Sequence, residues 1–270
     1  MFKIVETSVR DGHQSLFATR MTTDEVVSLV KGEEGSSTDD YYVRYDSSEQ
    51  VWKETLKPNI TYTYQKDTLP HVLVRNADGT FTFKRAEWAD RTIGDDDSNP
   101  LPSFIDSYIN DIFYFRNRLG FLAGENVILT RSADFFNFWM QSATKVQDTD
   151  PIDLAASDAT ISTLYNAVPH DTDLIVFSRE AQFALTSDGL LTPDKAVLTS
   201  ALTHYEASLK AKPVNAGRNV YFVDENKKRV VANQTANDSL FVRFLFLIPG
   251  KKWNFKKIDE KLQGAAADTS

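Results

Sequence analysis

The sequence contains no cysteine, only four histidines and no long hydrophobic run. The missing cysteines exclude disulfides, thiolate nucleophiles and zinc sites built on sulfur. With only four histidines, the sequence also offers few nitrogen ligands for a metal ion. The longest apolar run, Phe244 to Ile248, is far too short to span a bilayer. The first residues lack a basic stretch followed by an apolar one, so we expect no signal peptide and a soluble protein.

Positive charge is also scarce. Thirty basic side chains face thirty-eight acidic ones, for a net charge of −8. A surface that binds nucleic acid needs positive potential, so this balance argues against nucleic acid as the main partner. The chain is 270 residues long, 41% hydrophobic and 25% charged, which is an ordinary globular composition.

Composition changes along the chain predict four segments. They are a strand–helix segment at 1–31, an acidic linker at 32–40, a β-rich domain at 41–224 and a C-terminal segment at 225–270. In the first segment, Thr22 and Glu25 have capping-box spacing, which predicts a helix from about Thr23 through Leu29 and Val30.

The β-rich domain begins with two predicted hairpins. Tyr41–Tyr45 and Val51–Thr55 flank a polar turn. His71–Arg75 and Thr80–Lys84 flank a turn whose Asp-Gly step supplies a positive φ. The alternation places Phe81 and Phe83 on one face of the second strand, which predicts one buried face and one wet face.

Further short strands follow at roughly ten-residue spacing. The predicted strands are 112–115, 120–123, 126–131, 161–165, 173–178 and 181–186, with a possible short helix over the aromatic stretch 134–139. The expected fold is mainly β, built from antiparallel meanders in a sandwich or partly propeller-like platform with few short helices. No repeated motif of fixed period marks a propeller in the sequence.

Carboxylates offer the candidate metal sites. Asp11 and His13 follow a predicted strand, where a barrel enzyme keeps its ligands, although a turn capped by Asp11 explains them as well. Asp95–Asp97 could bind calcium, but a solvated turn is the favoured interpretation because no loop-closing glutamate follows. The aspartates at 148, 150 and 153 are interpreted in the same way.

Other patterns point to structure more than to chemistry. The basic stretches at 227–229 and 251–261 could contact an anionic partner, but a solvent-exposed face is the favoured interpretation. The aromatics between Phe135 and Trp139 indicate packing or a subunit contact. No serine lies in a nucleophile elbow, and no phosphate-binding or dinucleotide-binding glycine pattern occurs. We therefore expect no catalytic residue and no cofactor.

Residues from about 40 to 223 resemble the tail tubular protein B, or nozzle protein, family of short-tailed bacteriophages. The resemblance lies in YYVRYDSSEQVWKETL at 41–56, PHVLVRNADGTFTFK at 70–84, FYFRNRLGFLAGENVILTRSADFFNF at 113–138, DPIDLAASDATISTLYNAVP at 150–169, EAQFALTSDGLLT at 180–192 and GRNVYF at 217–222. It implies a virion subunit without enzymatic activity, which is soluble in the host cytoplasm before assembly. Such a subunit forms a homo-oligomeric ring beneath the portal and adaptor, meets tail fibres, and lets DNA pass during genome ejection.

The first thirty residues resemble a different family. IVETSVRDGHQSLFATRMTTDE at 4–25 is similar to the start of the carboxyltransferase domain of biotin-dependent enzymes such as oxaloacetate decarboxylase. That resemblance implies Asp11 as a divalent-metal ligand, with Arg10 and Gln14 near a keto-acid substrate. One strand and one helix cannot complete the metal shell of a barrel, so we expect no carboxyl transfer. A carboxyltransferase fragment in a chimeric chain remains the alternative to a tail protein.

Overall fold

The computed structural model describes residues 27–30, 41–157, 162–217, 219–225, 230–236 and 239–245. Strands dominate this part of the chain, and its single helical element is a 3₁₀ turn, Lys66–Thr68. The fold class predicted from the sequence is confirmed: the protein is mainly β and all strand pairing within the sheets is antiparallel.

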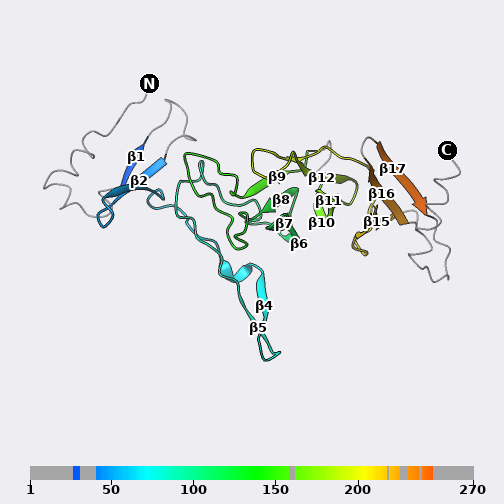
Figure 1. Cartoon of the computed structure of the whole chain (residues 1–270), viewed down its shortest axis with the longest axis horizontal. Coiled ribbons are helices and arrows are strands. Elements are labelled where there is room, and N and C mark those ends of the chain that lie inside the picture. Colours follow the sequence, from blue (N-terminus) through cyan, green and yellow to red (C-terminus); the bar gives the residue numbers. More distant parts are fainter. Residues whose placement is uncertain are drawn as a thin grey trace, which may run out of the picture.

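Three successive four-stranded meanders form the body of the molecule (Figure 1). The first contains β6 (Ile109–Phe115), β7 (Arg118–Ala123), β8 (Asn126–Leu129) and β9 (Ile152–Ala155). The second contains β10 (Leu164–His170), β11 (Asp173–Ser178), β12 (Gln182–Ser187) and β13 (Ala196–Leu198). The third contains β14 (Val214–Ala216), β15 (Asn219–Val223), β16 (Val230–Ala236) and β17 (Ser239–Leu245). Each pairs its strands in chain order, as the blades of a propeller do.

Short turns with positive φ set the register of these meanders. Arg116 and Asn117 both adopt positive φ (43° and 61°) in the two-residue loop between β6 and β7, which is the geometry of a type I′ hairpin turn. Gly124 (φ 55°) begins the next two-residue loop, and Asp171 (φ 51°) begins the loop between β10 and β11. The twist of such turns matches that of the strands they join, so tight up-and-down pairing follows.

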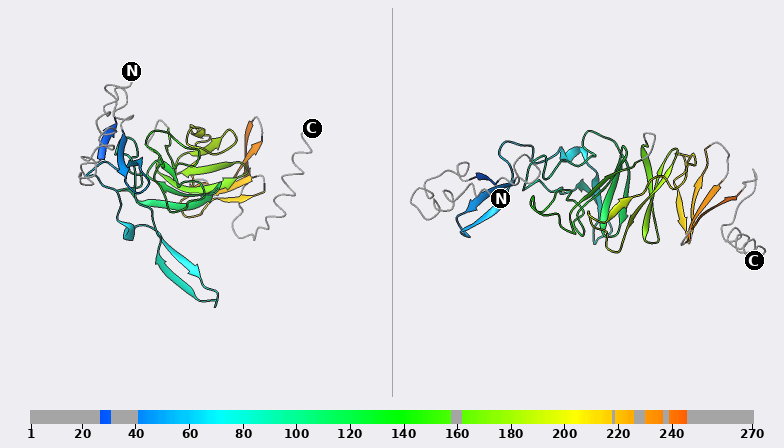
Figure 2. Two further views of the ribbon diagram at one scale, coloured as in Figure 1. Left: turned by 60° about the vertical axis from the view of Figure 1, so that its left-hand side comes forward. Right: turned by 90° about the horizontal axis from the view of Figure 1, so that it is seen from above.

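The middle sheet is buried on both faces. Along β11, Leu174 and Val176 pack into a core shared with the first meander, whereas Ile175 and Phe177 pack into a core shared with β15. Successive side chains of a strand point to opposite faces, so one apolar strand supplies both cores. The sheets consequently lie one after another along the long axis of the molecule (Figure 2).

A third core covers the other face of the first meander. Phe121, Ala123 and Ile128 meet side chains of the segment from Tyr64 to Phe104, together with Phe138 and Trp139. Two smaller sheets branch from this end. One pairs β1 (Val27–Val30), β2 (Tyr41–Asp46) and β3 (Val51–Thr55), and the other is the hairpin of β4 (His71–Arg75) and β5 (Phe81–Arg85).

Two helix predictions are wrong. Val27–Val30 is not helical but forms β1, whose four residues pair with β2; the β-branched valines suit a strand better than the capping-box spacing suits a helix. The aromatic stretch 134–139 forms turns. There the Asn137 side chain donates to Asp134 Oδ2 and accepts from the Trp139 amide, and such local bonds compete with helix formation.

Most strand predictions are confirmed with shifted ends, but the one at 161–165 overlaps an observed strand only at residues 164 and 165. β10 begins at Leu164 and continues past the predicted end at residue 165 to His170. Pro169 is tolerated there because β10 is an edge strand of its sheet. The four segments predicted from composition stay a prediction. Strand order runs across their limits, with β1 beside β2 and β16 beside β15.

The prediction of one buried face on the second hairpin is wrong. All five residues of β5 are exposed, and Phe81 and Phe83 retain 61% and 70% of their surface. The reason is position: the β4–β5 hairpin projects away from the meanders in every view that shows its length (Figures 1 and 2). Alternation correctly placed the two phenylalanines on one face, but no described element covers that face.

Candidate functional site

The residues at which the sequence suggested a metal site fall into two groups. Asp11 and His13, with Arg10 and Gln14, lie outside the described residues, so the carboxyltransferase-like ligand stays a prediction. In the part of the chain that is described, no three histidine, aspartate or glutamate side chains gather closely enough to hold a metal ion. The basic stretches at 227–229 and 251–261 also lie outside that part.

The aspartates at 95–97 build a turn. The Asp95 carboxylate accepts bonds from the amides of Asp97 and Ser98 and from the Ser98 hydroxyl. Burial acts to raise the pKa of Asp95, but the Ser98 bonds and the others outweigh it, so the pKa lies below its ordinary value. Asp96 pairs with the buried guanidinium of Arg91 at 2.8 Å. The predicted turn is present, but it is not fully solvated, because Asp95 is buried; Asp96 binds the Arg91 side chain and not the backbone.

The later aspartates have similar roles. Asp150 is fully buried, and its two carboxylate oxygens accept from the amides of Gln141 and Gln147. Asp153 accepts from the Ser103 amide and the Asn126 side chain. Asp153, in β9, fixes a loop against the first meander, whereas Asp150 holds together the loop that precedes β9.

The aromatic cluster at 135–139 is mainly packing. Phe138 and Trp139 are buried, and Phe138 meets the rings of Phe104 and Phe121 at centroid distances of 4.9 and 5.1 Å. The Trp139 indole donates to the Ala89 carbonyl at 3.0 Å. Phe135, by contrast, stays partly exposed at the surface of β6.

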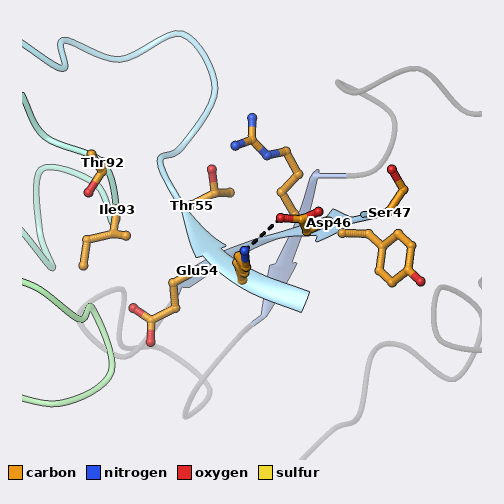
Figure 3. A pocket seen from close by; sticks show the side chains of 9 residues that line it. Asp46, Ser47, Glu54, Thr55, Thr92 and Ile93 are labelled. Atoms are coloured by element: carbon orange, nitrogen blue, oxygen red, sulfur yellow. Dashed lines mark hydrogen bonds and ion pairs between the residues drawn. The ribbon is translucent and has the colours of Figure 1, made fainter. Parts of the chain in front are cut away.

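A polar pocket of about 440 Å³ lies where the β2–β3 hairpin meets the segment around Ile93 (Figure 3). Its walls are Arg44, Tyr45, Asp46, Ser47, Lys53, Glu54, Thr55, Thr92 and Ile93. The joint is held by backbone bonds: the Gly94 amide donates to the Thr55 carbonyl, and the Lys57 amide donates to the Gly94 carbonyl.

Three charged side chains of this pocket, Asp46, Lys53 and Glu54, are engaged within the protein, whereas Arg44 is exposed. Lys53 binds Asp46 and Glu49, each at 2.8 Å (Figure 3 marks the bond to Asp46). The bond from Lys53, with further bonds from Ser48, holds the pKa of Asp46 well below its usual range. Glu54 points away from this pair and accepts from the Ser142 hydroxyl, the Ala143 amide and the Thr144 hydroxyl. The pocket thus joins a sheet to a loop and presents no pair of free acid and base groups among its lining residues.

Replacing Glu54 by alanine should lower the free energy of unfolding by about 1–3 kcal/mol, because three donors on the 142–144 loop would lose a charged acceptor. Urea unfolding followed by tryptophan fluorescence would measure the change. Glu49→Ala is the matched control: it removes only an exposed pair with Lys53, and we expect a loss below about 1 kcal/mol. Equal losses in the two variants would contradict the role given to Glu54.

Among the described residues, sequence reasoning missed an exposed apolar feature on the β4–β5 hairpin. Leu73, Phe81 and Phe83 are all more than 60% exposed. A signal for it did exist, because the same strand faces that carry the phenylalanines and leucine also carry Arg75 and Arg85. A face that combines aromatic and arginine side chains is more typical of an interface than of a core.

Among the described residues, no helix is long and apolar enough to cross a membrane. The described part of the chain thus offers a rigid set of packed sheets, a polar joint and one projecting apolar hairpin.

Comparison with known proteins identifies relatives of this chain. Residues 14–237 match the family model described as bacteriophage nozzle protein. The tail tubular protein gp12 of Escherichia phage T7 is 49% identical over 193 residues, which are 72% of this chain and 24% of that protein. The chain therefore spans about a quarter of the length of this curated relative.

One solved structure that matches is that of PorZ, a bacterial surface component of the type IX secretion system of Porphyromonas gingivalis. The match covers 78% of this chain and 26% of the PorZ chain. The identity is 15% and the TM-score is 0.33, so this likeness carries no argument about fold or function.

Proposed function

The chain belongs to the bacteriophage nozzle protein family, and from this premise we propose that it is a structural subunit of a short bacteriophage tail. The observation that carries the proposal is the 49% identity to a tail tubular protein over 72% of the chain. In this role the protein acts by its surfaces and transforms no substrate. Its place is the tail of the virion, and before assembly it is soluble in the host cytoplasm.

The architecture supports such a role. Three meanders with interlocking cores form a stiff slab, because the middle sheet is packed on both faces. A subunit of this kind assembles into a homo-oligomeric ring below an adaptor, contacts the fibres, and leaves a conduit for DNA. The net charge of −8 suits a conduit, since an acidic wall repels phosphates and lets DNA slide without adhering.

The alternative is a carboxyltransferase fragment with a divalent metal at Asp11. It rests on the resemblance of residues 4–25 alone. Metal analysis of the purified chain separates the two: a divalent ion that is lost in Asp11→Ala, together with decarboxylation of oxaloacetate, would favour the enzyme.

The tail role predicts binding to the structure on which a nozzle sits. We expect the purified chain to co-sediment with portal–adaptor particles of Escherichia phage T7 that lack tail tubular protein gp12, and electron microscopy to show added density below the adaptor. An unrelated acidic protein of similar size serves as the control. A chain that stays in the supernatant and adds no density would contradict the proposed function.

A further inference from the structure

The β4–β5 hairpin is anchored in the core and then leaves it. The residues just before and after it, Leu69 and Ala86, are buried in the core around Trp139. Beyond them the two strands run out from the body (Figures 1 and 2). An isolated two-stranded hairpin is marginally stable in water. Because all of β5 is exposed, the hairpin would gain stability if another molecule packed against it.

One face of the hairpin gathers its large side chains. In the strand register Leu73 lies opposite Phe83, Arg75 opposite Phe81, and His71 opposite Arg85. Because side chains alternate along a strand, these six share a face. We name it the hairpin face; it consists of His71, Leu73, Arg75, Phe81, Phe83 and Arg85. The His71 ring stacks on Phe83 with 5.2 Å between centroids.

The tip holds this face in a fixed shape. The Asn76 amide donates to the Thr80 carbonyl at 2.8 Å, and the Asp78 carboxylate accepts from both the amide and the hydroxyl of Thr80. The Asn76 side chain also donates to the hydroxyls of Thr80 and Thr82. Little ordering is then required when a partner binds, which favours association.

The charge of the hairpin is opposite to that of the chain. Residues 70–85 hold three basic side chains (Arg75, Lys84 and Arg85) and one carboxylate, Asp78. Arg85 pairs with Asp67 at 2.8 Å, which neutralises part of its charge. The whole chain has a net charge of −8. The body of another copy of the same protein is therefore electrostatically complementary to the hairpin, and such complementarity steers association.

We propose that the hairpin face docks on the acidic body of a second copy of this chain, with Leu73, Phe81 and Phe83 at the centre of the contact and the arginines at its rim. This inference rests on the proposed function as a ring subunit. The contact joins two different surfaces, so it is head-to-tail, and a head-to-tail contact closes into a ring when the rotation between neighbouring copies completes a full turn.

Duplex DNA is the poorer occupant. Aromatic side chains bind nucleic acid by stacking on unpaired bases, whereas the bases of a duplex are already stacked. The apolar centre of the hairpin face gains nothing from phosphates, and the acidic body behind it repels them. Binding of the hairpin to DNA is accordingly an outcome that the experiment must be able to detect.

The first test compares self-association by sedimentation velocity over a range of protein concentrations. In the triple variant Leu73→Ser/Phe81→Ser/Phe83→Ser we expect association at least about tenfold weaker than in the unmodified chain, as for the loss of central aromatic contacts. The control is Val51→Ser/Tyr62→Ser, two side chains that are 43% and 55% exposed outside both the β4–β5 hairpin and the three meanders, and it should associate like the unmodified chain. Circular dichroism and urea midpoints confirm that all three proteins are folded.

The second test identifies the occupant. With p-benzoylphenylalanine in place of Phe81, irradiation should produce a covalent dimer in which the hairpin is linked to a body peptide of another copy. Cross-links only to the adaptor, or only to added duplex DNA, would overturn the second copy as occupant. So would a triple variant that associates like the unmodified chain, or an unmodified chain that is monomeric at every concentration.

The two proposals can fail separately. If the triple variant still self-associates and co-sediments with portal–adaptor particles, the hairpin inference is wrong and the tail role stands. If the unmodified chain forms hairpin-dependent oligomers but never binds those particles, the hairpin contact stands and the tail role is contradicted.

Discussion

Replacing Arg118 by methionine is expected to lower the free energy of unfolding by about 3–5 kcal/mol, because several buried carbonyl oxygens would lose their donor at once. Arg118 begins β7 and is only 1% exposed. Its guanidinium donates to five backbone carbonyls, those of Asp150 (2.6 Å), Thr130 (2.8 Å), Asp148 (2.9 Å), Leu191 (3.2 Å) and Thr149 (3.4 Å).

These bonds join parts of the chain that lie far apart in sequence. The Asp148–Asp150 loop leads into β9 of the first meander, whereas Leu191 lies between β12 and β13 of the second. Burial lowers the pKa of Arg118 to about 10, which leaves the guanidinium protonated at neutral pH. A charged group at the junction of two sheets is thus solvated by the backbone instead of by water.

Chemical unfolding of the methionine variant measures the loss. Arg118→Lys should recover only part of it, since an ammonium group has three donors and no planar fork with which to reach five carbonyls. Arg116→Met is the control: Arg116 donates to one carbonyl, that of Gly189, and its loss should cost about 1 kcal/mol or less. A methionine variant as stable as the unmodified chain would show that the junction does not depend on these bonds.

The role of Arg118 could not be predicted from the sequence, unlike most of the strands around it. Three of the four strands of the first meander, β6, β7 and β8, were predicted, because short apolar runs bounded by turn residues such as Asn117 and Gly124 are local signals. β9 was not predicted. Nothing near Arg118 in the sequence shows that its side chain points inward. Four of its five carbonyl partners lie thirty or more residues away, and such long-range pairing leaves no local pattern.

The wrong helix and hairpin predictions have a related cause. The capping-box spacing of Thr22 and Glu25 is a local signal, but pairing with β2 decided the state of Val27–Val30. Alternation placed Phe81 and Phe83 on one face and could not say whether anything covers it. Burial depends on which elements lie nearby, and in an assembling protein the covering element can belong to another molecule.

The role of the acidic cluster was predicted only in part. Asp95–Asp97 formed an acidic cluster in the sequence, yet in the fold Asp95 binds backbone amides and Asp96 binds Arg91. Turn chemistry predicts such a role for aspartate in a polar connection. The family, in contrast, was evident from long collinear stretches of sequence, a signal that requires no catalytic motif.

The largest steric effect is expected at Gly120 in the middle of β7. Gly120 lies between Phe113 on β6 and Leu129 on β8 in the strand register. A Cβ atom added at Gly120 would lie 2.2 Å from Phe113 Cζ and 2.8 Å from Leu129 Cδ2. Distances this short are not tolerated, so the phenyl ring of Phe113 occupies the space that a side chain at Gly120 would need.

Gly120→Ala should therefore lower the free energy of unfolding by about 3 kcal/mol, at the upper end of typical overpacking losses. The ring cannot simply turn away, because Phe113 is buried in the core that joins the first and second meanders. Because protein interiors are closely packed, any shift of the Phe113 ring would also displace the side chains around it. Thermal and urea unfolding of the variant give the size of the loss.

A double-mutant cycle with Phe113→Leu tests the cause. If the alanine methyl collides with the phenyl ring, shortening residue 113 relieves the collision, and Gly120→Ala should cost about 1–3 kcal/mol less in the Phe113→Leu background than alone. The exposed Gly189, which has open space where its Cβ would lie, provides a control for the intrinsic effect of adding a methyl group. Because Gly189 has φ +82°, Gly189→Ala should lose only about 1 kcal/mol through backbone strain. A Gly120→Ala loss that is the same with phenylalanine or leucine at residue 113 would mean that strand geometry, and not the ring of Phe113, requires glycine at this position.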